Sequence, residues 1–326
     1  MMTRPLLTAF LGFLLAERLV VADSASYRFD SWTSDSGLPQ NSVYSILQTA
    51  DGYLWITTLD GLVRYDGIRF QIFNKINSKG INSNRFTKLF EDRDKNLWIS
   101  TEDRGLTRYR DGAFITYTMK DGLPTNWIES FRQNDSGELF VRTGKGVARW
   151  QDDRFALVSA DVNYFDSTLG YKDRSGALWH RLGSILRRVK DGEVTEYTIP
   201  EYKNVAPYRP PLYEDSQGRL WVGTNQTELF IVENGAMTRY TTEDGLPSYQ
   251  IGSFCEDSEG AVWMNTFGGG LVRFQGGRFT TFTTEDGFPS NNVMAICRDR
   301  EGTLWAGTNN HGLVRITKKI VEANLL

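Results

Sequence analysis

Two stretches of this sequence combine basic and aromatic side chains in a way that suits a negatively charged ligand. They read "SADVNYFDSTLGY" and "PEYKNVAPYRPPLY". Arg142 and Arg181 occupy matching positions in two neighbouring repeats, described below, where other repeats carry Thr, Ser, Asn or Gly. Guanidinium groups make forked hydrogen bonds to carboxylate or sulfate, and aromatic rings stack on sugar faces. We therefore predict a site for an oligosaccharide or another small polar ligand. Its predicted binding residues are Arg142, Arg181, Tyr164, Lys203, Tyr208 and Arg209, with Phe165 and Tyr202 nearby.

The same residues also have a simpler interpretation. Loops in repeat proteins vary without acquiring a function, and arginines on a surface commonly pair with carboxylates. Drift in two tolerant repeats would produce the same pattern. Both interpretations stay open from the sequence.

Residues that could form a catalytic centre are sparse. The two histidines, His180 and His311, lie far apart in the chain. The sequence contains no nucleophile elbow, no zinc-ligand spacing and no glycine-rich phosphate loop. The acidic run "EDRDKN" supplies too few oxygen ligands for calcium. We expect no catalytic residues, no metal and no cofactor in this chain.

Composition limits the fold class and the partners. The chain has 326 residues, with 37 basic and 40 acidic side chains, so it lacks the basic excess of a nucleic-acid-binding protein. Aromatic residues make up 13%, there are 31 glycines, and runs at helical spacing are rare. This combination favours an all-β protein with many tight turns.

A short phrase centred on an aromatic residue recurs with a period of about 42 residues. It reads "GYLWITT" in the first copy and "GTLWAGT" in the last. The central residues, which we call the anchors, are Trp55, Trp98, Phe140, Trp179, Trp221, Trp263 and Trp305. Such units are stable only when neighbouring copies bury one another's faces, so the anchors are predicted to be core.

Each copy is predicted to contain four short antiparallel strands. In the sixth copy these span residues 251–255, 261–266, 271–274 and 278–283. Four strands at this period describe a propeller blade, and seven copies predict a seven-bladed β-propeller. Residues 27–33, in "SYRFDSWTSDSGLP", match the fourth-strand phrase "GGRFTTFTTEDGFP". We predict that they complete the seventh blade and close the ring.

The loops of such a disc divide between its two faces. Turns between second and third strands lie on the same face as the crossovers between copies, which usually read "DGLP" or "DGFP". We call this the crossover face. Its loops vary, and the fourth and fifth copies lack the "DGLP" phrase, so we predict that it is the recognition surface.

The phrases "DGLPSYQIGSFCEDSEGAVWMNTFGGGLVRF" and "DGFPSNNVMAICRDREGTLWAGTNNHGLVRI" resemble the two-component regulator propeller repeat. That family occurs in periplasmic sensor regions of bacterial hybrid histidine kinases and some diguanylate cyclases. The resemblance implies a ligand-binding sensor that signals through a membrane-bound kinase or cyclase, or through a further part of the same protein. This chain has one ring and no immunoglobulin-like, kinase or cyclase module, so we expect either a fragment of a longer sensor or a stand-alone relative. The alternatives are a propeller enzyme of the streptogramin-lyase type and a non-catalytic platform for protein interactions.

The first 22 residues have the order of features of a secretory signal peptide. Arg4 precedes an apolar run, and Val20 and Ala22 form a small-residue cleavage site. Glu17 and Arg18 interrupt the run before it reaches the ~20 residues that span a membrane. We therefore predict a signal peptide over 1–22, a single propeller domain over 23–326, and a periplasmic or secreted protein.

Overall fold

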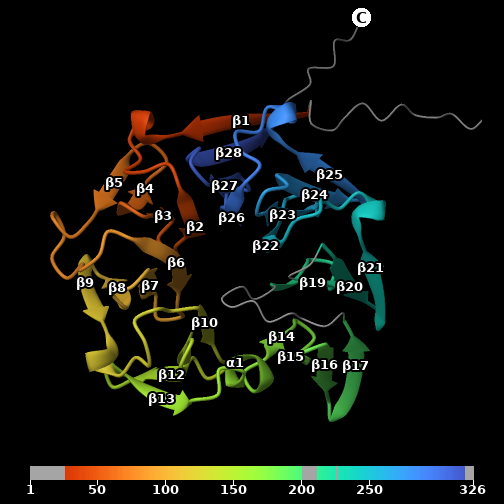
Figure 1. The fold of residues 1–326 in the computed structure, drawn as a ribbon, viewed down its shortest axis with the longest axis horizontal. Coiled ribbons are helices and arrows are strands. Elements are labelled where there is room, and N and C mark those ends of the chain that lie inside the picture. Colours follow the sequence, from red (N-terminus) through yellow and green to blue (C-terminus); the bar gives the residue numbers. More distant parts are fainter. Residues whose placement is uncertain (1–25, 200–210, 225–226, 320–326) are drawn as a thin grey trace, which may run out of the picture.

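The described residues form seven four-stranded antiparallel sheets arranged around a central axis (Figure 1). The computed structural model describes residues 26–199, 211–224 and 227–319. The predicted seven-bladed β-propeller is confirmed. The predicted signal peptide, residues 1–22, lies outside the described residues.

The first four blades follow one another in chain order. Blade 1 consists of β2 (Val43–Gln48), β3 (Leu54–Thr58), β4 (Gly61–Tyr65) and β5 (Phe70–Phe73). Blade 2 consists of β6 (Phe86–Glu91), β7 (Leu97–Thr101), β8 (Leu106–Arg110) and β9 (Ala113–Tyr117). Blade 3 consists of β10 (Ser130–Gln133), β11 (Leu139–Thr143), β12 (Gly146–Gln151) and β13 (Arg154–Ser159). Blade 4 consists of β14 (Tyr171–Lys172), β15 (Leu178–Leu182), β16 (Ile185–Lys190) and β17 (Glu193–Thr198).

The remaining blades complete the ring, with the first strand of each nearest the axis (Figure 1). Blade 5 consists of β18 (Leu212–Glu214), β19 (Leu220–Gly223), β20 (Leu229–Glu233) and β21 (Ala236–Tyr240). Blade 6 consists of β22 (Ile251–Glu256), β23 (Val262–Thr266), β24 (Leu271–Gln275) and β25 (Arg278–Phe282). Blade 7 consists of β26 (Val293–Arg298), β27 (Leu304–Thr308), β28 (Leu313–Lys318) and the N-terminal strand β1 (Tyr27–Trp32).

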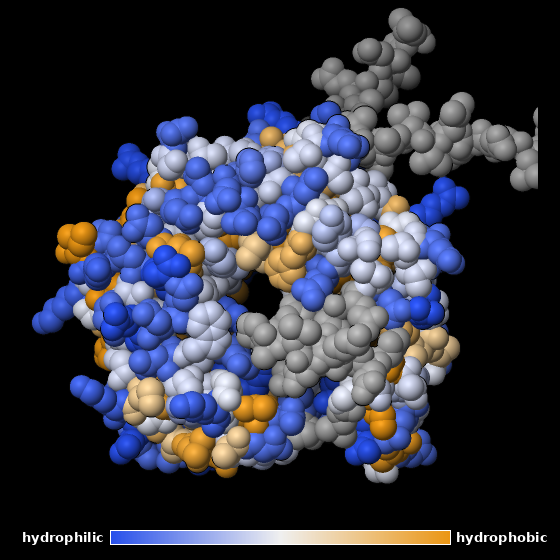
Figure 2. Space-filling view, viewed as in Figure 1, coloured by the Kyte–Doolittle hydropathy of each residue, from blue (hydrophilic) through white to orange (hydrophobic). Residues whose placement is uncertain are grey.

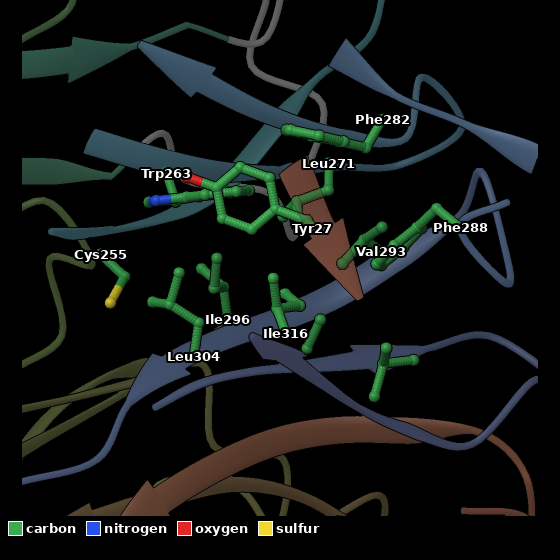
Figure 3. Packing of buried hydrophobic residues seen from close by; sticks show 12 residues of the cluster. Tyr27, Cys255, Trp263, Leu271, Phe282, Phe288, Val293, Ile296, Leu304 and Ile316 are labelled. Carbon is green, nitrogen blue, oxygen red and sulfur yellow. The ribbon is translucent and has the colours of Figure 1, made fainter. Parts of the chain in front are cut away.

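The ring closes through β1, as the sequence predicts. This strand pairs antiparallel with β28, from Tyr27 opposite Lys318 to Trp32 opposite Leu313. Tyr27 places its ring edge-on to the Trp263 ring at 5.1 Å, in the apolar cluster between blades 6 and 7 (Figure 3). The first described strand therefore holds the last blade to its neighbour.

The seven anchor residues are buried, as predicted, and the six tryptophans among them donate hydrogen bonds from their indole nitrogens. Five of these tryptophans donate from Nε1 to an Asp carboxylate six residues earlier, at 2.7 or 2.8 Å. The acceptors are Asp92, Asp173, Asp215, Asp257 and Asp299. The other oxygen of each carboxylate accepts backbone N–H groups of the turn. Each Asp therefore fixes the hairpin and also satisfies the buried indole.

The "DGLP" phrase forms a compact crossover. Short 3₁₀ turns at η2 (Ser34–Ser36), η3 (Met119–Asp121), η4 (Thr242–Asp244) and η5 (Thr284–Asp286) precede a glycine in the left-handed region. Gly122 has φ of 94°, and a Cβ there would lie 1.8 Å from the Phe155 carbonyl oxygen. The next residue, Leu123 in this copy, is buried. In copy four the helix α1 (Tyr164–Ser167) takes the place of this crossover.

Candidate functional site

A cavity of about 1060 Å³ lies at the axis of the propeller. The space-filling view shows an opening near the middle of the disc (Figure 2). Every blade contributes to its wall through at least one residue at or beside its first strand, such as Tyr44, Thr87, Ser130, Tyr171, Leu212, Gly252 and Met294. The cavity volume slightly exceeds the ~300–1,000 Å³ range of small-molecule sites.

The loops around the cavity belong to the crossover face. Leu59, Glu102, Gly183 and Phe267 line it from turns between second and third strands. Trp127, Asn163 and Gln250 line it from crossovers. The cavity therefore lies on the side of the disc that the sequence predicts to be the recognition surface.

Arg142 lies on β11 in the cavity wall and is ion-paired. Only 2% of its side chain is exposed. Its Nε and Nη2 donate to Glu129 Oε2 at 3.0 and 2.9 Å, and its Nη1 donates to Asp166 Oδ2 at 3.0 Å. Asp166 belongs to α1, so the unusual crossover of copy four supplies one of the two carboxylates. Arg142 thus connects blade 3 to α1 and is already surrounded by carboxylate oxygens.

Arg132, on β10 of blade 3, also contacts α1. Its Nη1 donates to the Phe165 carbonyl oxygen at 2.7 Å, and its guanidinium lies 4.5 Å from the centre of the Phe165 ring. Arg142 also lies over this ring, at 5.7 Å. Two cations on one buried ring fix α1 against the cavity wall. Burial lowers the pKa of Arg132, and Asp166 opposes that change.

Lys88, on β6, brings a third cation to the wall from blade 2. Its Nζ donates to the Glu129 carbonyl oxygen. The Lys88 side chain is open to the cavity but surrounded by protein on its other sides. The loss of solvent on those sides is the larger cause, and the positive charge of Arg142 the smaller one, of a pKa that is lowered to about 8. Glu129 acts in the opposite direction. Lys88 is therefore charged at neutral pH and loses that charge in mildly alkaline solution.

Arg181, on β15, adds a fourth cation from blade 4. Its Nη1 donates to the Gly223 carbonyl oxygen at 3.1 Å, across the interface with blade 5. Arg181, Lys88, Arg132 and Arg142 all line the cavity. Two carboxylates, Glu129 and Asp166, lie among them, and the third acidic residue of the wall, Glu102, pairs with Arg85. Among the described residues of this sector, positive charge therefore exceeds negative charge, which favours an anionic ligand.

The structure separates the predicted binding residues into three groups. Arg142 and Arg181 come together in the cavity wall. Tyr164 is half-buried and packs with Phe140 and Val147 instead of lining the cavity, because it lies on the blade side of α1. The predicted residues Lys203, Tyr208 and Arg209, and Tyr202 beside them, lie outside the described residues.

Sequence reasoning missed Lys88, Glu129, Arg132 and Asp166. A usable signal was present in the repeat alignment. Ten residues before the anchor, the other copies have Ser, Leu, Pro or Ala where copy two has Lys88. Eight residues before it, the other copies have Leu, Phe, Tyr or Cys where copy three has Arg132. A charged residue at a first-strand position where the other copies have uncharged residues indicates a side chain that lines the central cavity.

The two histidines do not lie in this cavity wall. His180 is on β15 and His311 is in the turn between β27 and β28. His311 is exposed, with Nδ1 lying 3.2 Å from the Asn309 carbonyl oxygen. Neither is among the residues that line the cavity.

Five segments of the chain match the family model for the two component regulator propeller. They span residues 37–60, 80–103, 209–226, 245–268 and 287–310, in blades 1, 2, 5, 6 and 7. Histidine kinase P4 of Formosa agariphila is 42% identical over 52 residues, which are 16% of this chain and 4% of that protein. The sequence resemblance to this family is confirmed.

Solved structures show the same fold. The extracellular domain of a proposed hybrid two component system from B. thetaiotaomicron superposes with a TM-score of 0.68 at 21% identity, over 90% of this chain and 42% of that one. A catalytically inactive virginiamycin B lyase from Staphylococcus aureus, solved with quinupristin, gives 0.65 at 15% identity, over 90% and 100%. This chain thus spans less than half of the extracellular domain that it resembles. Among the described residues, no helix has the length and apolar character needed to cross a bilayer.

Proposed function

The chain carries two-component regulator propeller repeats, and on that premise we propose that it is an extracytoplasmic sensor domain that binds an anionic ligand in its central cavity. The observation that supports this proposal is the cationic sector formed by Lys88, Arg132, Arg142 and Arg181. Among the described residues, two carboxylates, Glu129 and Asp166, lie between these cations. These cations lie in a cavity with low-dielectric walls, where charges act more strongly than in open water.

The ligand class follows from the groups that line this sector. Lys88 and Arg181 supply charge-assisted hydrogen bonds, each worth about 1.5–3 kcal/mol. Trp127 lines the cavity with 42% of its surface exposed, and Phe267 contributes a second ring. A sugar that carries carboxylate or sulfate would use both kinds of group, through ion pairing and through stacking of its ring faces. An acidic oligosaccharide therefore suits the site better than a neutral one.

Arg142 has a different role in this proposal from Arg181. Its donors are directed at Glu129 and Asp166, so it positions these carboxylates and α1 and leaves ligand contact to its neighbours. Lys88 and Arg181 are the residues that would meet the ligand's charge. Lys203, Tyr208 and Arg209 remain predicted contributors from the adjoining segment.

The same premise supports a proposal for the compartment in which this chain acts and for the partner that receives its signal. The relatives include an extracellular domain of a proposed hybrid two component system and a histidine kinase. We place this chain outside the cytoplasm, exported by its predicted signal peptide, with a membrane-bound kinase or cyclase, or a further part of the same protein, receiving the signal. Its likeness to lyases is one of fold, and no catalytic role is proposed.

Calorimetry against paired neutral and acidic oligosaccharides tests the proposal. The wild-type protein should bind at least one acidic glycan and bind its neutral counterpart at least tenfold more weakly. Lys88→Met and Arg181→Ala should each weaken binding by about tenfold, on the scale of ~1.4 kcal/mol per decade. Lys145→Met, in the β11–β12 turn of blade 3 and not in the cavity wall, is the matched control and should bind as the wild type does. Binding that ignores both cavity substitutions would overturn the proposal.

A further inference from the structure

Aromatic rings fill most of the interfaces between neighbouring blades in one repeated way. At four interfaces the anchor Trp contacts an aromatic ring on the third strand of the next blade. These pairs are Trp55 with Tyr109 at 4.9 Å, Trp98 with Trp150 at 5.0 Å, Trp221 with Phe274 at 5.1 Å and Trp305 with Tyr65 at 5.9 Å. Each covering ring also packs on a fourth-strand ring directly opposite it, at 4.7–5.0 Å. One ring of the following blade thus covers each of these anchors, and a second ring of that blade packs on the covering ring.

Blade 5 lacks both of these rings. Val232 on β20 lies opposite Leu220, in the register that Phe274 occupies opposite Val262 in blade 6. On the fourth strand, Met237 lies opposite Val232 where Phe279 lies opposite Phe274. Trp179 of blade 4 therefore meets aliphatic side chains of the next blade. Trp263 also faces an aliphatic residue in this register, Ile316 of blade 7, but Tyr27 on the fourth strand covers it. The interface between blades 3 and 4 also has a valine in this register, Val189, but there the anchor is the smaller Phe140.

A second cavity lies beside Val232, where the missing third-strand ring would be. Its volume is about 450 Å³, and its wall includes Trp179, Tyr197, Leu220 and Val232. The hairpins around it, at Ser175, Gly218 and Asn234, belong to the face opposite the crossover face. An engineered apolar cavity of about 150 Å³ already binds benzene, so this one has room for a larger ring.

The walls of this cavity can accommodate a planar ring that carries polar groups at its edge. Trp179 and Tyr197 stack with centroids 5.8 Å apart and an interplanar angle of 25°, and both form part of the wall, with 3% and 9% of their surface exposed. Asp173 accepts from Trp179 Nε1 at 2.8 Å, and Arg188 lies 5.8 Å from the Trp179 ring. Burial raises the pKa of Asp173, but the hydrogen bonds from Trp179 and Ser175 outweigh it and the pKa is lowered. The indole is therefore held in a fixed orientation beside charged groups.

We infer that the interface between blades 4 and 5 is a second binding site, for a small molecule with a planar aromatic ring. The bound ring takes the place that Phe274, Trp150 or Tyr109 takes at the equivalent interfaces, over an anchor that is already positioned to receive it. Hydrogen-bonding substituents on the ring meet Asp173, Thr195 or Asn234 at the cavity edge. This site is on the opposite face from the central cavity and does not depend on the sensor proposal.

Indole is the probe for this site, with cyclohexanol as a non-aromatic probe of similar size. Wild-type protein should bind indole saturably, measured by ligand-observed NMR titration, and should bind cyclohexanol at least tenfold more weakly. Val232→Phe restores the missing ring, so it should raise the melting temperature and weaken indole binding at least tenfold. Val189→Phe makes the same change in blade 4 and should leave indole binding unchanged. Lys88→Met, in the central cavity, should also leave it unchanged.

The inference is wrong if wild-type protein shows no saturable indole binding at millimolar concentration, or if Val232→Phe binds indole with wild-type affinity. If Val232→Phe does not fold, wild-type crystals soaked with 4-bromoindole decide the question. An anomalous bromine peak between Trp179 and Val232 supports the site, and bromine located elsewhere or nowhere overturns it.

Discussion

Removing β1 tests how the propeller is closed, because this strand supplies the outer edge of blade 7. A chain that starts at Ser34 loses the six backbone pairs from Tyr27 to Trp32 with β28. It also loses the Tyr27 side chain, which is 6% exposed, and the partly buried Phe29 and Trp32. Those rings contact Trp263, Phe282, Phe288 and Trp305, which would become exposed to solvent.

The size of the effect follows from the buried surface. A large apolar side chain contributes about 1.5–3 kcal/mol when it is fully buried. One buried ring and two partly buried ones therefore sum to roughly 4–6 kcal/mol, against a total stability of about 5–15 kcal/mol for a typical domain. We expect the chain that starts at Ser34 to unfold at a much lower urea concentration than the chain that starts at Ser26.

Urea unfolding followed by tryptophan fluorescence measures this difference directly. Tyr27→Ala in the longer chain should lower the free energy of unfolding by about 3–5 kcal/mol, as large-to-small aromatic substitutions do. Tyr27→Phe keeps the ring against Trp263 and is the control, with a change below about 1.5 kcal/mol. A peptide of residues 26–33 added in trans should restore part of the lost stability. Equal urea midpoints for the chains starting at Ser26 and Ser34 would refute closure by β1.

Three further predictions follow from the site and the scaffold. Affinity for an anionic ligand should fall as the pH rises through about 8, because Lys88 is charged below its pKa and neutral above it. Calorimetry at pH 7 and pH 9 should show this loss of affinity, and Lys88→Met should remove the pH dependence. Arg142→Ala leaves Glu129 and Asp166 without their buried partner, so urea unfolding should show a loss of about 3–5 kcal/mol, whereas unchanged stability would contradict the role given to this ion pair. Asp92→Ala removes the acceptor of the Trp98 indole and should lower the free energy of unfolding by about 1–3 kcal/mol in the same assay, with wild-type stability counting against the indole contact.

The fold could be read from the sequence because its signals are repeated. A period of about 42 residues, one aromatic anchor per copy and a fourth-strand phrase at residues 27–33 each predict a different property of the ring. Blade number, strand number and closure all follow from these patterns. The second role of Asp92 and its equivalents was missed, since sequence spacing alone does not show that a turn residue reaches the indole of the following strand.

The residues around the cavity could be predicted only in part, because they are departures from the repeat. Arg142 and Arg181 stand out in a column of small residues, and both line the cavity. Their part in ligand binding stays a prediction. Tyr164 looked equivalent to its neighbour Phe165, but α1 turns its side chain toward Phe140 and away from the cavity. The helical turn that decides this orientation has no counterpart in the other crossovers that the structure describes, so no repeat pattern could have predicted it.

The central claim is that excess positive charge in the axial cavity selects the ligand. Its most direct test compares the dissociation constants of one acidic oligosaccharide and its carboxyl-reduced or desulfated counterpart, for the wild type and for the double variant Lys88→Met, Arg181→Ala. The acidic form should bind the wild type at least tenfold more tightly, and the double variant should bind both forms alike. Equal affinity of the wild type for both forms, or a preference for the acidic form that persists in the double variant, would contradict the claim.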